Sequence, residues 1–465
     1  IVFGALKRHF GHPKIPFYAL ETFEYLCKDA SHKLVYDTHR AIIESVVGFM
    51  DNPKAGAQVQ ENGCFILGTV AKCNTENCKS ISAANGIPLI VSAMVQHRAR
   101  RTVQEKACSA LYELARDLEC CKSIGITNGV VVVVNAMRKH RDAAQVQVNG
   151  CSTLSRLVDD TDNCRLIKEA HGVAVVLEAI RHYECDVKVQ VRGIFALGKL
   201  SGRDHGNRRA IVEADGIRVV LEAMQKHFCH AQVQAAGCSA LSNLVPGHKS
   251  REVIIAESCT AVQNAMKRHW SMTGVQEKAC WALGELAEDT GSRRIIASRG
   301  GIESVLSSMR HHVSDASVQA SACRALGRLA NLNQDNSKMI VNGNGIPLLI
   351  STMRHHLAHA PVQSSACFAL SHLTEASNGC KLIVKNAGIA AVIESMQRHA
   401  CHDGVQKWAC CLLKLLAKGG LRYQKQIRDA GGIMLIQLVK ATFPDNKSLH
   451  WYADDALQAL GEGVV

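Results

Sequence analysis

Aromatic residues and prolines are scarce in this sequence. Phe, Trp and Tyr make up 5% of the 465 residues, and there are only 8 prolines. The core therefore has to be built from Ala, Val, Leu, Ile and Cys. No Pro-rich or Gly/Ser-rich stretch that would serve as an interdomain linker is present. Since one compact core stops growing at roughly 250–300 residues, these absences favour an elongated fold over a string of linked domains.

Long apolar runs are also missing. No run approaches the roughly 18 uncharged residues that a membrane-spanning helix needs, and residues 1–10 lack the long apolar region of a secretory signal. We therefore expect no membrane span. The apolar fraction of 47% excludes wholesale disorder. The formal net charge of +13 says more about partners than about fold, and it leaves acidic peptides, nucleic acid and anionic surfaces open.

Sequence signatures of catalysis are absent. There is no phosphate-cradling Gly-rich loop ending in Lys-Ser/Thr, no Gly-x-Ser-x-Gly turn and no His-Glu-x-x-His helix. We therefore predict that the protein is not an enzyme and that it binds no cofactor.

What the sequence does contain is an internal repeat. The dipeptide Val-Gln recurs at intervals of 42 to 44 residues, starting at Val59, Val103, Val146, Val189, Val233, Val275, Val318, Val362 and Val405. Degenerate forms of this anchor stand at Ile15 and Leu449. A period of this length predicts a stack of similar units, each leaning on its neighbours.

The residues after each anchor predict an amphipathic helix of about four turns. The fourth position is always Gly or Ala, and the eleventh is Leu in every unit except at Val70. The fifth is Cys in eight units: Cys64, Cys108, Cys151, Cys238, Cys280, Cys323, Cys367 and Cys410. We expect the small residue to let a neighbouring backbone approach, and the thiol to act as a small hydrophobe. Thiols at repeated core positions favour a reduced, cytoplasmic setting.

A glycine stands seventeen residues before most anchors, at Gly86, Gly129, Gly172, Gly216, Gly301, Gly345, Gly388 and Gly432. We expect it to adopt the left-handed backbone of a sharp turn between two short helices. Each unit then reads as a short helix, a turn, a second helix, a loop and the long third helix. Ile42 and Ser258 replace this glycine in two units, so the turn is in question there.

A three-helix unit of this length with a glycine turn before helix two resembles the armadillo repeat, best over residues 301–329 and 345–373. The resemblance covers essentially the whole chain and predicts an all-α, right-handed superhelix of about eleven repeats. We predict one solenoid spanning residues 1–465, with a partial repeat at 1–30 and further repeats at 31–74, 75–117, 118–160, 161–203, 204–247, 248–289, 290–332, 333–376, 377–419 and 420–465. The abrupt ends suggest a piece of a larger protein, or ends covered by another chain.

Histidine recurs six residues before eight anchors, at His9, His97, His140, His227, His269, His312, His356 and His399, with Lys or Arg beside it. One interpretation is that these basic groups end helix two by capping its carbonyls and offsetting its dipole. The other is a pH-tunable basic ridge that meets an acidic tail, RNA or anionic lipid. We favour the first.

Three of the loops that follow helix two combine His and Cys: residues 182–185, 227–230 and 399–402. Such side chains can bind soft metals. Structural zinc sites usually bring four ligands, whereas each loop offers at most three. We therefore predict no metal site.

The resemblance implies that the third helices line a concave face that binds extended peptides. At the third, sixth and tenth positions after each anchor, the residues vary instead of repeating, as a recognition surface does. Trp, Phe and Arg at such places are typical of binding hot spots. The partner-binding residues that we predict are Arg156, Arg192, Phe195, Lys199, Asn243, Trp281, Arg324, Arg328, Phe368 and His372.

Nuclear-import adaptors of the armadillo family carry a ladder of Trp and Asn on these helices. Here Trp281 and Asn243 fill those places once each, in different repeats, which disfavours binding of basic localisation signals. The stretch from Arg156 to Arg328 leans basic. We predict a scaffold or adaptor that captures an extended, acidic segment of a partner protein. Two alternatives stay open: a regulatory armadillo module of a larger multidomain signalling protein (a kinase or GTPase), and a basic-ridge binder of nucleic acid or an anionic surface, of which nucleic acid is the less favoured.

Overall fold

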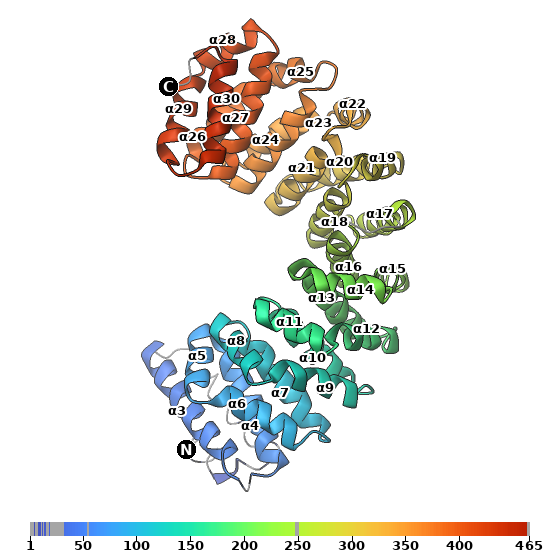
Figure 1. The fold of residues 1–465 in the computed structure, drawn as a ribbon, viewed down its shortest axis with the longest axis vertical. Helices are drawn as coiled ribbons and strands as arrows, with labels where there is room; N and C mark the ends of the chain where they lie inside the picture. The colour runs from blue at the N-terminus through green and yellow to red at the C-terminus, as the bar shows by residue number, and fades with distance from the viewer. Residues whose placement is uncertain are drawn as a thin grey trace. The chain divides into compact units, whose positions relative to one another are not determined.

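The computed structural model describes residues 32–53, 55–246 and 251–462, together with residues 4, 8–10, 12, 14 and 18. This part of the chain contains twenty-eight α-helices and no strand (Figure 1). The predicted partial repeat at 1–30 and its degenerate anchor at Ile15 lie almost wholly outside the described residues.

Most helices fall into the three predicted classes. The short first helices are α5 (Thr75–Ala83), α8 (Leu118–Ile126), α11 (Thr161–Glu169), α14 (His205–Glu213), α19 (Thr290–Ser298), α22 (Gln334–Asn342), α25 (Gly379–Lys385) and α28 (Leu421–Asp429). The second helices are α6 (Gly86–Gln96), α9 (Gly129–Lys139), α12 (Gly172–His182), α15 (Gly216–Lys226), α20 (Gly301–His311), α23 (Gly345–His355), α26 (Gly388–Arg398) and α29 (Gly432–Thr442). The third helices are α4 (Ala57–Cys73), α7 (Arg101–Leu114), α10 (Ala144–Leu157), α13 (Val187–Arg203), α16 (Ala231–Leu244), α18 (Thr273–Leu286), α21 (Ala316–Ala330), α24 (Ala360–Leu373), α27 (Asp403–Lys418) and α30 (Lys447–Ala459).

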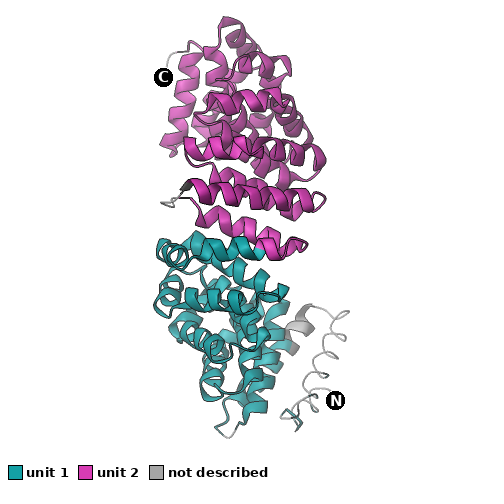
Figure 2. Cartoon of the chain, turned by 90° about the vertical axis from the view of Figure 1, so that its right-hand side faces the viewer, with its two compact units in different colours: residues 1–223 teal, residues 224–465 magenta. Residues whose placement is uncertain are grey.

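The chain divides into two compact units, residues 1–223 and residues 224–465 (Figure 2). In unit 1, third helices α4, α7, α10 and α13 pack against one another in succession; in unit 2, α16, α18, α21, α24, α27 and α30 do the same. Each unit is therefore an all-α stack of armadillo-type repeats, which confirms the predicted fold class. The prediction of one continuous solenoid with the repeat boundaries given above stays a prediction.

The repeated stripe of helix three is the core. In α21, Val318, Ala322, Cys323 and Leu329 have no exposed surface, and the equivalent residues of most other third helices are buried as well; Val59 of α4 and Asp454 of α30 are partly exposed. The small residue of this stripe has a different role from the predicted one. A Cβ atom added to Gly150 would lie 2.5 Å from Cγ of Met137, so the position makes room for a helix-two side chain, not for a backbone.

Close backbone approach does occur, but five residues further along helix three. A Cβ atom at Gly284 would lie 3.1 Å from Cα of Ala325 in the next third helix, and Gly68 meets Ala110 in the same way at 3.0 Å. The third helices are thus in close contact at this position, because glycine removes the side chain that would hold them apart.

The turn glycine also acts differently from the prediction. The left-handed residue is the one before it: Asn344 has φ of 59°, while Gly345 is the first residue of α23. A Cβ atom on Gly345 would lie 2.5 Å from Cγ2 of Ile340 and 2.8 Å from its carbonyl oxygen. Glycine is therefore needed because helix two begins directly against the end of helix one, not because of its backbone angle.

Where the glycine is missing, the turn is missing. Helix α3 (His32–Met50) runs unbroken through Ile42, and α17 (Arg251–Arg268) runs unbroken through Ser258. A side chain at this position would clash with the end of helix one across a sharp turn, so the two short helices continue as one. The sequence placed the exceptions correctly.

The glutamine of each Val-Gln anchor ends helix two. The side-chain amide of Gln319 donates to the carbonyl oxygens of Met309 and His312, each at 2.8 Å. Seven other anchors repeat this pair of bonds, for example Gln147 with Met137 and His140. Because the last carbonyls of a helix lack partners within it, a buried glutamine recurs at each repeat.

Candidate functional site

The ten predicted partner-binding residues all lie on third helices, and each keeps some exposure. Arg156, Arg192, Phe195 and Lys199 lie on α10 and α13 of unit 1; Asn243, Trp281, Arg324, Arg328, Phe368 and His372 lie on α16, α18, α21 and α24 of unit 2. Since the two groups belong to different units, each is described by itself.

In unit 2, Arg324 joins α21 to the preceding third helix. Its guanidinium lies over the indole of Trp281, 4.6 Å from the ring centroid, and its Nη2 lies 3.3 Å from Oε1 of Glu285. Arg328, one turn further on, lies 3.2 Å from the other oxygen of the same carboxylate. Two cations therefore share one anion on a face where Trp281 is 38% exposed.

Burial lowers the pKa of Arg328 below its usual value; Glu285 and Glu288 oppose this shift, while the charge of Arg324 adds to it. An additional negative charge supplied from outside would relieve the repulsion between the two guanidinium groups.

Further along the stack, aromatic side chains contact one another across three third helices. Phe368 of α24 lies 4.6 Å from Trp408 of α27, and Trp408 lies 6.4 Å from Tyr452 of α30, measured between ring centroids. Lys407 holds its ammonium 5.2 Å from the centroid of Trp408 and 5.0 Å from that of Tyr452. Helices α24, α27 and α30 run side by side in Figure 1.

Sequence reasoning missed Trp408 and Tyr452, although the signal was present. Each stands three residues after an anchor, Val405 and Leu449 respectively, which is one of the positions already identified as variable. We call the combined set the unit 2 face; it consists of Trp281, Glu285, Arg324, Arg328, Phe368, His372, Lys407, Trp408 and Tyr452.

His372 sits against the aromatic part of this face, 4.8 Å from the ring of Phe368. Burial lowers the pKa of His372, and the charge of Arg293 adds to the effect. Arg293 is itself buried at the start of α19 and donates to the carbonyl oxygens of Ala287 and Glu288. The lowered pKa favours the neutral imidazole at this position.

The predicted residues of unit 1 contact side chains outside the predicted set. Arg156 lies over the ring of Tyr112 at 3.9 Å, and Lys199 shares Asp159 with Arg203. Phe195 is 40% exposed. Arg192 is exposed on the same helix. Asn243, predicted for the same surface, is half-buried on α16 and belongs to unit 2.

The histidines at the end of helix two have a role that neither interpretation foresaw. Nε2 of His312 donates to the carbonyl oxygen of Trp270, in the loop of the preceding repeat, at 2.7 Å. His140, His269, His356 and His399 make the same bond. Each ring therefore ties one repeat to the previous one; the capping of helix two itself is done by the anchor glutamine.

The arginines next to these histidines contact the following repeat. Arg310 donates to the carbonyl oxygen of Gly343 at 2.8 Å, at the end of the first helix of the next repeat. Arg138, Arg181 and Arg354 do the same. We call these histidines and arginines the helix-two edge. Since their polar atoms already serve neighbouring backbones, the support for this edge as a free basic ridge is reduced.

The buried thiols of the third helices are poorly reactive. Burial raises the pKa of Cys108, Cys151 and Cys367 to about 12 in each case, so these groups stay protonated and poorly nucleophilic at neutral pH. Among the residues that the structure describes, no three or more His, Cys, Asp or Glu side chains cluster as metal ligands.

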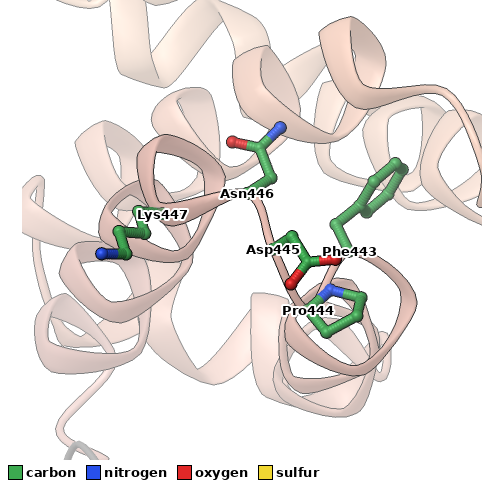
Figure 3. Close-up of a pocket in the computed structure, with 5 residues that line it drawn as sticks. All are labelled: Phe443, Pro444, Asp445, Asn446 and Lys447. Atoms are coloured by element: carbon green, nitrogen blue, oxygen red, sulfur yellow. The ribbon is translucent and has the colours of Figure 1, made fainter.

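A depression between α29 and α30 is lined by five consecutive residues, Phe443 to Lys447 (Figure 3). Their side chains point in different directions rather than toward a common centre. The depression therefore offers no constellation of chemical groups. No single helix of the described residues is long and apolar enough to cross a membrane; two bent pairs, α5 with α6 and α8 with α9, reach that length and composition only together.

Comparisons with known proteins agree with this architecture. The family model described as the LRRK2 ARM repeat matches residues 19–213 and again residues 247–441. The fold is similar to that of an engineered protein (24% identity, 91% of this chain and 99% of the other, TM-score 0.70).

It is also similar to a solved structure from work on a phosphorylation switch in the interaction between cadherin and beta-catenin (14% identity, 95% and 98% coverage, TM-score 0.53). At these identities the likeness concerns the fold alone. No curated protein sequence matches the chain. The two matched segments make up most of the sequence, and the chain belongs to the LRRK2 ARM repeat family.

Proposed function

We propose that this protein is a non-catalytic scaffold that captures an extended segment of a partner protein on the unit 2 face. The observation that carries the proposal is a pair of neighbouring side-chain clusters on successive third helices. Arg324 lies over Trp281 across α21 and α18, and Phe368, Trp408 and Tyr452 contact one another across α24, α27 and α30. Phe368 also packs over Gly327 of α21. These side chains stand at positions that differ from repeat to repeat, unlike the core.

The chemistry of the face suits protein recognition. Trp, Tyr and Arg are the side chains that most often carry binding energy in interfaces. Here they hold one another in place before a partner arrives, which reduces the entropy lost on binding. Arg324 and Arg328 share a single carboxylate, so the partner segment that we propose is acidic. The unit 1 residues Arg156, Arg192, Phe195 and Lys199 are proposed as a second, smaller contact region.

We also propose a cytoplasmic location. The structure describes nineteen cysteines, all of them free. Free thiols in this number are typical of reducing compartments.

The test is the pair of substitutions Trp281→Ala and Arg324→Ala in the full chain. Affinity purification with quantitative mass spectrometry should show loss of the partners bound by the unsubstituted protein, while circular dichroism stays the same. The matched control replaces Trp270, which is 62% exposed outside the face, and the exposed Arg398. An unchanged set of partners in the first variant would count against the unit 2 face.

A second candidate is a regulatory armadillo module within a larger signalling polypeptide, such as a kinase or GTPase. The match to a family described as the ARM repeat of LRRK2 favours it. A longer transcript encoding a catalytic domain in the same reading frame would establish it, and transcripts that encode only this solenoid would exclude it.

A further inference from the structure

The cations of the third helices share an arrangement across both units. Lys106 lies over Phe65 at 4.9 Å in unit 1, as Arg324 lies over Trp281 at 4.6 Å in unit 2. Lys407 lies near two rings, those of Trp408 and Tyr452. In each case the aromatic face is already occupied by a cation of the chain itself.

A ring held in this way no longer offers its face to a cation of a partner. The charged head, by contrast, stays available, because a cation–π contact uses electrostatic attraction to the ring and leaves N–H donors free. The rings therefore position the cations, and the cations are the groups presented to a ligand. An anionic ligand is favoured over a cationic one.

Lys407 is the clearest example of a cation that remains available to a ligand. In the described part of the chain it makes no ion pair, whereas Lys414 on the same helix lies 2.7 Å from Asp455. At the other end of the unit 2 face, Arg324 shares Glu285 with Arg328. The face thus carries two positions where positive charge exceeds negative charge, on α21 and on α27.

Helix α24 separates these two positions and contributes no excess charge. It presents Phe368, with His372 beside it, and burial keeps the pKa of that histidine low. The middle of the face is therefore apolar.

The spacing follows from helix packing. Adjacent packed helices lie roughly 8–10 Å apart, so the step from α21 to α27 is about 16–20 Å. An extended chain advances about 3.3 Å per residue. Because successive side chains of an extended chain point to opposite sides, two side chains that reach both cations are about six positions apart.

We infer that the unit 2 face reads a spaced pattern in its partner: two carboxylates about six residues apart, with one apolar side chain between them on the same side of the extended segment, an even number of positions from each. The first carboxylate contacts Arg324 and Arg328, the apolar side chain contacts Phe368, and the second carboxylate contacts Lys407. This inference rests on the proposed function and specifies which segment the face accepts.

The test uses the full chain and three labelled synthetic peptides of nine residues in a Gly/Ser background. The first carries Glu at positions 2 and 8 and Leu at position 6, so that all three side chains lie on the same side of the extended peptide. The second has the same composition with the glutamates at positions 2 and 4, and the third replaces both glutamates by glutamine. Fluorescence anisotropy should show about tenfold tighter binding of the first peptide than of either control.

Two variants locate the contacts. Lys407→Gln and Arg324→Gln should each remove the preference for the first peptide over the second. Their matched controls, Lys425→Gln and Arg398→Gln, change equally charged, exposed residues away from the face and should leave the preference intact. Because all four positions are on the surface, folding is expected to survive, and circular dichroism checks it.

Equal binding of the first two peptides, binding of none, or the same loss in the control variants would overturn the inference. A single-stranded RNA that displaces the first peptide and is insensitive to Lys407→Gln would do so as well, since it would indicate general attraction of polyanions. If partner capture still depends on Trp281 and Arg324 while the peptides show no spacing preference, only the inference fails. If neither effect is seen, the proposed function fails too.

Discussion

The helix-two edge and the unit 2 face contain similar side chains and use them differently. On the edge, His312 and Arg310 donate to backbone carbonyl oxygens of the repeats before and after their own, at 2.7 and 2.8 Å. On the face, Arg324 contacts the side chains of Trp281 and Glu285 instead. The edge recurs with the repeat, whereas the face does not.

The difference teaches how to separate framework from recognition in a repeat protein. A backbone carbonyl stands at the same place in every repeat, so a side chain that serves it must recur as well. A contact between two side chains has no such constraint and can change with the partner. Substitutions on the edge should therefore lower stability, and substitutions on the face should mainly affect binding.

The largest loss is expected from Gln319→Ala. It leaves the carbonyl oxygens of Met309 and His312 without their shared donor in a buried place, which costs about 2–4 kcal/mol of unfolding free energy. Urea denaturation followed by circular dichroism measures it. A loss as small as that of an exposed glutamine such as Gln397→Ala would show that the anchor glutamine is not part of the framework.

Gly345→Ala should cost about 1–3 kcal/mol, since the new Cβ atom would press on Ile340, both side chain and carbonyl. Gly48→Ala is the matched control: it lies within α3 with open space around it and should stabilise by about 0.5–1 kcal/mol. The same urea titration compares the two. Equal effects would contradict the close approach of helix two to helix one.

His312→Phe should cost about 1 kcal/mol, because it removes one bond between repeats while keeping a ring of similar size. His311→Phe, at the neighbouring exposed position, should change stability much less. Thermal denaturation of both variants beside the unsubstituted protein gives the comparison. If the two behave alike, the tie between repeats has no energetic value.

Arg324→Gln should change stability by less than about 0.5 kcal/mol, since partly exposed ion pairs contribute little. Its effect should instead appear in partner binding. A stability loss as large as that of Gln319→Ala would show that Arg324 serves folding, and would contradict the distinction between the edge and the face.

The smallest expected effect is a pH dependence at His372. Its pKa is lowered by burial and by Arg293. Above the ordinary histidine pKa, the His372 side chain is neutral in both the folded and the unfolded chain, so it does not lower the stability. As the pH falls below that value, the unfolded chain binds a proton at His372 more readily than the folded chain does, and the free energy of unfolding decreases. Between about pH 7.5 and about pH 5.5, the urea midpoint should fall more for the unsubstituted protein than for His372→Gln. An equal fall would exclude this contribution.

Much of the fold followed from the sequence. The Val-Gln period located the third helices, and Ile42 and Ser258 marked the two units without a sharp turn, now seen as α3 and α17. Several reasons given for the pattern were wrong. The small residue after the anchor accommodates a helix-two side chain such as Met137, and the turn glycine provides space, while the residue before it takes the left-handed angle.

The candidate site was only partly predictable. The variable positions led to Trp281, Arg324 and Phe368, and the same rule applied to the last two anchors would have led to Trp408 and Tyr452. What no spacing rule could supply is the partner of each side chain. That Lys407 reaches the ring of Tyr452 on the next helix depends on how α27 and α30 pack.

The sequence by itself determined the repeat length, the helix classes and the buried stripe, because periodic hydrophobicity is a property of the chain alone. Only the tertiary structure decided which basic groups are tied to carbonyl oxygens and which remain for a partner. The physical reason is that hydrogen bonds and ring contacts between repeats join residues some 40 positions apart, for example His312 with Trp270, and their geometry arises only when the helices are stacked.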